Sequence, residues 1–395
     1  MFREEIKKHL EECILPFWMG LKDDEYGGYY GYVGSDLAVD RRASKGCILN
    51  SRILWFFSSC ALILKDDKYL PYAKQAYTFM KDAFWDETNG GVYWSVTFDG
   101  KPEDKTKHTY CQAFAIYGLS AYFEAAGDRE ALKKAEELMH IIEDRCRDSE
   151  GYLEAFNFDF TPASNDKLSE NGVMADRTMN TLLHVFEAYT LLYDADRDPF
   201  VAERMKEMLS IFRDRVYEKP GHRLKVFFDM DYNSLLDMLS CGHDIETAWL
   251  IDRGIEVLGD ETIKKSIDPM TSDLADNILH TAFNGRFLPQ EVVEGVLSDT
   301  TEWWVQAEAL VGFLNEYSKD PSREEFLKAA YAEWDFIKDR LIMKESGGEW
   351  YLKVDREGSP DTSSPVVWPW KCPYHNGRMC LEVIKRIPDK DDRAS

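Results

Sequence analysis

The sequence predicts an all-α protein, an (α/α)6 barrel (toroid) of six inner and six outer helices with short β-hairpins in the connecting loops. Three observations predict this fold. A turn marker recurs along the chain, an amphipathic helix pattern precedes each marker, and a helix that is apolar on nearly all sides follows it. No Pro-, Gly- or Ser-rich linker divides the chain, so we expect residues 1–395 to form a single catalytic domain.

The turn markers are followed by short aromatic or β-branched stretches. They are separated by 63, 60, 71, 63 and 63 residues and are centred on Gly28, Gly91, Gly151, His222, Gly285 and Gly348. A constant spacing of this size indicates a repeated structural unit. Because each stretch is short, we expect hairpins at these places and no separate sheet domain.

The helix before each marker is predicted to have one solvent-exposed face. In residues 130–145 the apolar side chains recur at helical spacing, and lysines and glutamates fill the positions between them. This pattern is typical of a helix that packs on one side and contacts water on the other. Such helices suit the outer ring.

The helix after each marker has no polar face. These segments are residues 48–64, 109–126, 179–193, 244–258, 303–317 and 376–387. A helix that is apolar all round is buried, so these segments suit the inner ring. An open α-solenoid is the alternative, but it needs capping repeats with a polar outer face, and the ends of this chain show none.

Composition excludes several classes of partner. The chain carries 72 acidic and 48 basic residues, a net charge of −24, which repels nucleic acid and anionic lipid. No apolar run approaches the roughly 20 residues that cross a bilayer, and residues 1–18 are typical of an amphipathic helix and not of a signal peptide. We therefore expect a cytoplasmic protein with no nucleic acid or membrane partner. We also expect a monomer. The eight cysteines form no CxxC pair, which favours reduced, buried thiols.

Polar side chains gather near the starts of the predicted inner helices. In a closed ring these N-terminal ends converge on one mouth, where free amides and helix dipoles favour ligand oxygens. We predict a pocket there because polar residues recur near the start of the inner helix in all six units. They are Asn50, Arg52, His108, Tyr110, Gln112, Asn180, His184, His243, Glu246, Trp303, Trp304, Gln306, Glu308, His375, Asn376 and Arg378.

Several of these residues also have purely structural explanations. Arg52 could be a buried cation with partners, and His184 could be a core histidine. Glu246 lies three residues after His243 and could simply orient that imidazole. Gln112 and Glu308 could stand behind the pocket, and His108 could face the surface. These alternatives stay open at the level of sequence.

His243 and His375 indicate proton transfer. Imidazole titrates near pH 6.5 and serves as acid or base near neutrality. The chain has no G-x-G-x-x-G, Walker, H-E-x-x-H or G-x-S-x-G motif. His184, His243, Glu246 and His375 offer metal-ligand types without a diagnostic spacing, so we expect no metal and no cofactor.

Six segments resemble, in order and spacing, those of the N-acylglucosamine 2-epimerase superfamily, and most closely its cellobiose 2-epimerase group. They are KGCILNSRILWFFS, HTYCQAFAIYGLSAYFEAAGD, MNTLLHVFEAYTLLY, GHDIETAWL, EWWVQAEALVGF and WKCPYHNGRMCLEVIKR, and the resemblance runs over residues 1–387. The resemblance implies an isomerase that interconverts the reducing-end glucose of β-1,4-linked disaccharides (cellobiose, lactose) with mannose. The C2 proton leaves to give a cis-enediolate, which is reprotonated on the opposite face.

The resemblance also implies roles for individual residues. His375 and His243 form the acid/base pair, either sharing ring opening and proton transfer or serving the two faces, and His184 assists at the ring oxygens. The remaining residues hold the substrate. Arg52, Asn180 and Tyr110 bind the carbonyl and the enediolate, and Glu246 and Glu308 bind hydroxyls or tune the histidines. Trp304 and Trp370 stack on the two sugar rings, and Trp303 joins them or packs beneath.

One residue departs from the pattern of the resemblance. Glu302, before the tryptophan pair, is acidic where relatives usually carry a basic residue, which puts the substrate preference in doubt.

Competing functions remain at this stage. An aldose–ketose isomerase of the mannose isomerase kind, or an N-acylglucosamine 2-epimerase, would use the same fold and the same intermediate type. A glycoside hydrolase would instead use Glu246 and Glu308 as acid and base. A sugar-binding toroid without catalysis would keep the tryptophans and would not need paired histidines.

Overall fold

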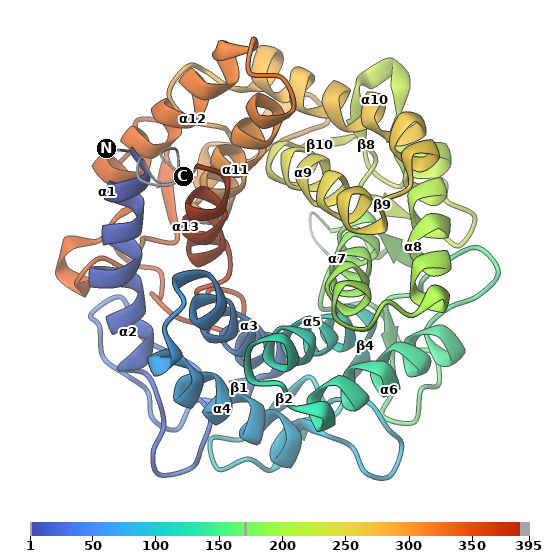
Figure 1. The fold of residues 1–395 in the computed structure, drawn as a ribbon, viewed down its shortest axis with the longest axis vertical. Coiled ribbons are helices and arrows are strands. Elements are labelled where there is room, and N and C mark those ends of the chain that lie inside the picture. Colours follow the sequence, from blue (N-terminus) through green and yellow to red (C-terminus); the bar gives the residue numbers. More distant parts are fainter. Residues whose placement is uncertain (1, 170–171, 388–395) are drawn as a thin grey trace, which may run out of the picture.

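The inner ring is closed. The computed structural model describes residues 2–169 and 172–387, and Figure 1 shows two concentric rings of helices. The last inner helix contacts both the first and the fifth, which excludes an open solenoid. The inner helices are α3 (Cys47–Leu64), α5 (Thr109–Ala126), α7 (Met179–Asp196), α9 (Cys241–Leu258), α11 (Trp303–Lys319) and α13 (His375–Arg386).

The outer ring is built from amphipathic helices, as predicted. In α6 the buried residues are those of the predicted apolar stripe, Leu132, Leu138 and Ile142 among them. The first outer helix runs without a break through α1 (Phe2–His9), η1 (Leu10–Ile14) and α2 (Leu15–Met19). The others are α4 (Leu70–Phe79), α6 (Arg129–Arg145), α8 (Pro199–Ile211), α10 (Glu261–Asn277) and α12 (Glu324–Phe336).

Most outer helices contain one π-helical turn. Four of them end in such a turn: η3 (Met80–Phe84), η4 (Phe212–Val216), η6 (Ile278–Ala282) and η7 (Ile337–Leu341). In the first outer helix the π turn, η1, lies in the middle. Short 3-10 turns complete the helical elements: η2 (Asp67–Tyr69), η5 (Lys219–Gly221) and η8 (Lys344–Ser346).

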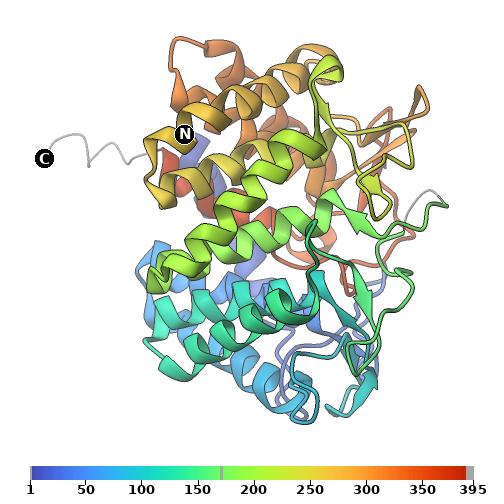
Figure 2. The ribbon, with the colours of Figure 1, turned by 90° about the vertical axis from the view of Figure 1, so that its right-hand side faces the viewer.

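Short strands guide the chain into the inner helices. Five strands end directly before an inner helix: β1 (Lys45–Gly46), β4 (Lys107–His108), β6 (Arg177–Thr178), β10 (Met238–Ser240) and β13 (Thr300–Glu302). Each pairs antiparallel with a strand of the following unit, namely β2 (Ser95–Val96), β5 (Ala155–Phe156), β9 (Phe227–Phe228), β11 (Glu291–Val293) and β14 (Lys353–Asp355). The remaining strands are β3 (Pro102–Asp104), β7 (Tyr217–Glu218), β8 (Arg223–Leu224) and β12 (Val296–Leu297). The hairpins lie at one end of the barrel (Figure 2).

A repeated ion pair ties the turn markers to the inner helices. Within four units a carboxylate in the marker turn binds a cation just before the next inner helix. The pairs are Asp23–Lys45 (2.6 Å), Asp86–Lys107 (2.9 Å), Asp148–Arg177 (2.6 Å) and Glu349–Lys371 (3.0 Å). Three of the four are almost fully buried, so each charge depends on its partner.

The fourth residue of several inner helices also holds a marker turn. Gln112 accepts from the Val92 N–H at 2.8 Å and donates to the Val92 carbonyl at 2.9 Å. Gln306 makes the same two hydrogen bonds with the backbone N–H and carbonyl of Leu288. Gly91 precedes Val92 with φ +73°, and a Cβ there would lie 2.8 Å from the Gln112 oxygen. The side chains of Gln112 and Gln306 therefore stabilise the hairpins, and our expectation that they contribute to the pocket is wrong.

Helix α3 has the length and hydropathy of a membrane-spanning helix, although the sequence pattern suggested no run of that size. Of its 18 residues, 83% are buried inside the barrel. Its apolar character is explained by its place in the inner ring, where every side contacts protein.

Candidate active site

The N-terminal ends of the inner helices surround a cavity of about 420 Å³. Ten of the eleven site residues predicted from the sequence line it: Arg52, Tyr110, Asn180, His184, His243, Glu246, Trp303, Trp304, Trp370 and His375. The eleventh, Glu308, is buried behind His375, so one of the structural alternatives for that residue is realised.

The repeat explains why these residues meet. The sixth residues of α3, α7, α9 and α11 are Arg52, His184, Glu246 and Glu308. Residues at the same position of symmetry-related helices point toward the barrel axis at the same depth. The titratable side chains of four segments far apart in the sequence therefore lie at the same depth along the barrel axis.

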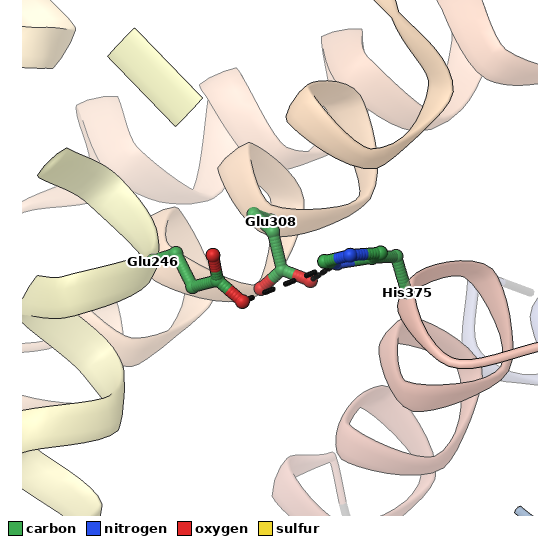
Figure 3. A group of neighbouring side chains, drawn as sticks. All are labelled: Glu246, Glu308 and His375. Atoms are coloured by element: carbon green, nitrogen blue, oxygen red, sulfur yellow. Dashed lines mark hydrogen bonds and ion pairs between the residues drawn. The ribbon is translucent and has the colours of Figure 1, made fainter. Parts of the chain in front are cut away.

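The imidazole of His375 is fixed by a carboxylate. Its Nδ1 lies 2.7 Å from Oε1 of Glu308, as Figure 3 shows, and Oε1 of Glu246 lies 4.0 Å from the same nitrogen. An ionised carboxylate only accepts hydrogen bonds, so Nδ1 carries the proton and the lone pair is on Nε2. His375 thus presents a basic nitrogen to the cavity.

His184 and His243 are held in the same manner through Nδ1. Nδ1 of His184 lies 2.8 Å from Oε2 of Glu187, and Nδ1 of His243 lies 2.7 Å from the Ser240 hydroxyl. Both partners are only three residues away along the chain. Because Nδ1 is occupied in each ring, Nε2 is the nitrogen that remains for a ligand in the cavity.

Arg378 connects the carboxylates beneath the histidines. Its Nη1 donates to Glu187 at 2.6 Å, and its Nη2 donates to Glu308 at 2.7 Å and also to Glu246. Its Nη1 also contacts the hydroxyl of Tyr374. One buried guanidinium therefore binds three buried carboxylates and offsets part of their charge, which would otherwise be very costly.

The pKa values reflect this burial and charge. Burial lowers the pKa of His375 well below its usual value, and Arg378 acts in the same direction. Burial likewise lowers the pKa of His243 to about 3. Burial raises the pKa of Glu246 to about 7, with the nearby charge of Glu308 adding to the effect. Burial alone would raise the pKa of Glu187, but Arg378 brings it down to about 2. Near neutral pH His375 and His243 are therefore uncharged.

Arg52 is a buried cation at the cavity wall. Its Nη2 donates to the Tyr110 hydroxyl at 2.8 Å and its Nη1 to the Trp370 carbonyl at 3.2 Å. Its guanidinium lies 4.1 Å and 4.5 Å from the ring centres of Phe114 and Tyr374. Within the described residues no carboxylate forms an ion pair with Arg52, so its charge is available to an oxyanion in the cavity.

Four buried polar atoms that belong to cavity-lining residues have no hydrogen-bond partner in the described part of the chain. They are Nε of Arg52, Oδ1 of Asn180, Nε1 of Trp303 and Nε1 of Trp368. Native proteins rarely leave buried polar atoms without partners. Three donors and one acceptor on residues that line one cavity suit a ligand rich in hydroxyl groups.

Aromatic rings border the cavity. The Trp304 ring centre lies 4.7 Å from His243 and 5.6 Å from His375, so both imidazoles lie against the same indole. Trp370 lies at 5.7 Å from Tyr110. Glu302 accepts from the Trp304 indole N–H at 2.8 Å. The unusual acidic residue therefore has a structural role, because this hydrogen bond fixes the orientation of the indole ring.

Other polar residues that we expected in the pocket lie elsewhere. Asn50 donates to the Gly46 carbonyl at 3.0 Å and Asn376 donates to Glu349 at 2.9 Å. His108 is fully buried and bonds Asn165 at 3.1 Å, so the surface alternative for it is wrong. All three stabilise the entrance of an inner helix.

Sequence reasoning missed several cavity residues. Trp368, Ser240 and Lys167 line the cavity, and Glu187 holds His184 from behind. Ser240 and Glu187 each stand three residues from a histidine on the same helix or its entry, a spacing that could have identified them. Arg378 was included among the polar residues of the pocket, but its contacts with three distant glutamates leave no sequence signal.

Glu246, Glu308 and His375 are close enough to resemble a metal site, since their ligand atoms lie within 4.8 Å of one another (Figure 3). Arg378 donates to both glutamates in this group. The positive charge that the carboxylates need is therefore already supplied by a guanidinium.

Comparison with known proteins agrees with this geometry. Residues 28–376 match the family model of N-acylglucosamine 2-epimerase (GlcNAc 2-epimerase). The chain is 48% identical to a cellobiose 2-epimerase of Eubacterium cellulosolvens, over 98% of each chain. It matches the crystal structure of a sugar epimerase from a ruminal bacterium with a TM-score of 0.96 at 48% identity, covering 98% of this chain and 100% of that one. A cellobiose 2-epimerase structure from Bacillus thermoamylovorans B4167 matches at 43% identity and a TM-score of 0.94, covering 98% and 99%.

Proposed function

The chain belongs to the N-acylglucosamine 2-epimerase family, and we propose that it is a cellobiose 2-epimerase, an isomerase acting at C2 of the reducing-end glucose of β-1,4-linked disaccharides. One observation carries the proposal: three imidazoles, each fixed through Nδ1, line one cavity together with a cationic guanidinium. Relatives that are 44% to 48% identical over nearly the full chain are cellobiose 2-epimerases by name.

The reaction begins with the opening of the glucose ring. His243 accepts the proton of the anomeric hydroxyl, and His184, whose Nδ1 is held by Glu187, donates a proton to the ring oxygen. The aldehyde that forms makes the C2 proton removable, because the resulting charge spreads onto the carbonyl oxygen. His243 and His375 are uncharged near neutral pH and can take protons in these steps.

His375 then removes the C2 proton through Nε2. The carboxylate of Glu308 at Nδ1 stabilises the imidazolium that results. The oxygen of the cis-enediolate becomes negative, and Arg52, Tyr110 and Asn180 hold it. Fixed donors of this kind contribute about 3–4 kcal/mol each to the stability of such a transition state.

Protonation of C2 from the opposite face, by the protonated His243, gives mannose. When the ring closes, the carbonyl oxygen takes the proton that His375 holds and the hydroxyl at C5 returns its proton to His184, so all three imidazoles regain their starting states. The Trp304 ring lies against both imidazoles. Trp304 and Trp370 bind the apolar faces of the two sugar rings, and Trp303 packs beneath, since it is only 3% exposed. The charge of −24 and the buried state of most of the described cysteines fit a monomeric cytoplasmic enzyme.

The test is incubation with cellobiose or lactose in D2O, followed by NMR and sugar analysis. We expect glucosyl-mannose or galactosyl-mannose with deuterium at C2. Free glucose would indicate hydrolysis, a ketose product would indicate an aldose–ketose isomerase, and turnover of N-acylglucosamine in preference to cellobiose would indicate that epimerase instead. The His375→Ala variant is the control, and it should bind the disaccharide without turning it over.

A further inference from the structure

A second cavity of about 170 Å³ lies at the other end of the barrel, between the C-terminal halves of five inner helices. The ninth residues of α3, α5, α7 and α9 form its inner end: Trp55, Tyr117, Glu187 and Trp249. Arg378 of α13 completes this layer. We call this space the lower cavity.

Two residues separate the lower cavity from the active site. Glu187 lines the lower cavity and holds Nδ1 of His184 at 2.8 Å. Arg378 also lines it and donates to Glu308, which holds His375. A ligand in the lower cavity would therefore touch the side chains that fix two of the active-site imidazoles.

The walls combine aromatic, aliphatic and charged groups. Trp55 and Tyr117 stack with ring centres 5.4 Å apart, and both are under a tenth exposed. Charged groups of both signs stand at the wall as ion pairs, Arg253 with Asp194 at 3.0 Å and Lys385 with Glu382 at 2.9 Å. Four carboxylates (Glu124, Glu187, Asp194 and Glu382) and three cations (Arg253, Arg378 and Lys385) line the cavity, and burial raises the pKa of Glu124 to about 7. The charges therefore nearly balance, which disfavours an anion or a cation and suits a neutral ligand.

One donor in this layer is unused. Nε of Arg378 is buried and has no hydrogen-bond partner in the described part of the chain, although the residue is only 2% exposed. The other two nitrogens of the guanidinium bind carboxylates. A buried N–H without a partner indicates a missing acceptor.

We propose that the lower cavity binds a neutral polyhydroxylated ring of monosaccharide size and that its occupancy changes the rate of the active site. Aromatic rings cover the apolar face of such a ligand, and the ion pairs donate to and accept from its hydroxyls. If the proposed function holds, the cavity of 420 Å³ takes a disaccharide, so the lower cavity of 170 Å³ takes about one ring.

Binding is tested with 1,5-anhydroglucitol, a pyranose that cannot open. Saturation-transfer NMR is run with excess reduced cellobiose, which lacks a carbonyl and is too large for the lower cavity, so that the active site is blocked. We expect a saturable signal that Ser59→Phe abolishes, because Ser59 lines the lower cavity and the larger side chain fills it. Arg253→Ala, at the half-buried wall, should weaken binding several-fold even if Ser59→Phe folds poorly. Ser210→Phe on the exposed side of α8 is the matched control.

The kinetic arm measures kcat at saturating cellobiose. We expect 1,5-anhydroglucitol to change kcat at least twofold in the wild type and in Ser210→Phe, and to leave kcat unchanged in Ser59→Phe. A signal that the reduced disaccharide removes entirely, or one that does not saturate, overturns the site. Binding without a change in kcat overturns the link to catalysis. The NMR arm needs no turnover, so a failure of the proposed epimerase activity remains distinguishable from a failure of this site.

Discussion

Oε1 of Glu308 accepts from Nδ1 of His375 at 2.7 Å and from Nη2 of Arg378 at the same distance. This single oxygen thus joins an imidazole at the cavity to the cation that compensates the buried carboxylates. Because the oxygen is shared, the basicity of His375 depends on residues that never touch the substrate.

His375→Ala should lower kcat by about 10² to 10⁴-fold, the usual contribution of a positioned general base. KM should change little, because Trp304, Trp370 and Arg52 still bind the substrate. Steady-state kinetics with cellobiose measure both values. His140→Ala, on the exposed side of α6, is the matched control and should keep full activity. A kcat within threefold of the wild type would contradict the role of His375.

The pH profile should report the lowered pKa of His375. A base must be uncharged, so activity falls when the imidazole is protonated. Because burial and Arg378 lower its pKa, the acid limb of kcat/KM should lie below pH 6.5. Glu308→Gln removes a negative charge beside Nδ1, which should move that limb still lower and reduce kcat about 10- to 100-fold. If the acid limb of kcat/KM lies at the same pH in Glu308→Gln as in the wild type, Glu308 has only a packing role.

Arg52→Lys should reduce kcat by about 10² to 10³-fold although the charge is kept. Lysine lacks the planar fork with which Arg52 donates to Tyr110 and the Trp370 carbonyl while facing the cavity. Rates of C2–H exchange in D2O isolate the enediolate step and should fall in parallel. Arg286→Lys, at an exposed site, serves as the control. Equal exchange rates in the two variants would rule out Arg52 as the oxyanion holder.

Glu302→Leu should raise KM for cellobiose about 2- to 10-fold and leave kcat nearly unchanged. The Trp304 indole loses its acceptor, and an aromatic contact of this kind is worth about 0.5–1.5 kcal/mol. Binding titrations with reduced cellobiose should show the same factor. Glu357→Leu, at an exposed site, is the comparison. If kcat falls with KM unchanged, Glu302 acts on the chemical step and the interpretation is wrong.

Glu333→Gln should stabilise the protein at pH 8. The carboxyl is fully buried on α12, neither oxygen has a hydrogen-bond partner in the described residues, and burial raises its pKa well above the usual value. The folded state keeps the proton while the unfolded state loses it near pH 4.5, so stability falls as pH rises above that value. We expect a gain of about 1–3 kcal/mol in urea unfolding at pH 8 and a much smaller one at pH 4.5.

Glu325→Gln, exposed on the same helix, should change neither midpoint. A Glu333→Gln gain that is equal at both pH values would mean that the effect comes from packing and not from the proton.

The fold could be predicted because its signal is local and repeated. Five of the six inner helices begin within one residue of the predicted position, and the sixth, α9, begins three residues earlier. That extra turn places His243 inside the helix, where Ser240 reaches its Nδ1. The polar residues at the helix starts indicated the pocket, since helices in a closed ring must converge.

The helices, the ring and the side chains at its mouth could be predicted from the amino-acid sequence, because periodicity of 3.6 residues and the spacing of the units are properties of neighbouring residues. Which polar side chains face the cavity and which face the hairpins became clear from the folded structure, as Gln112 and Gln306 show. It alone brought Arg378 to Glu187, 191 residues away along the chain, and placed a second cavity beneath them. Such contacts depend on how the ring closes, and ring closure joins segments whose spacing carries no local signal.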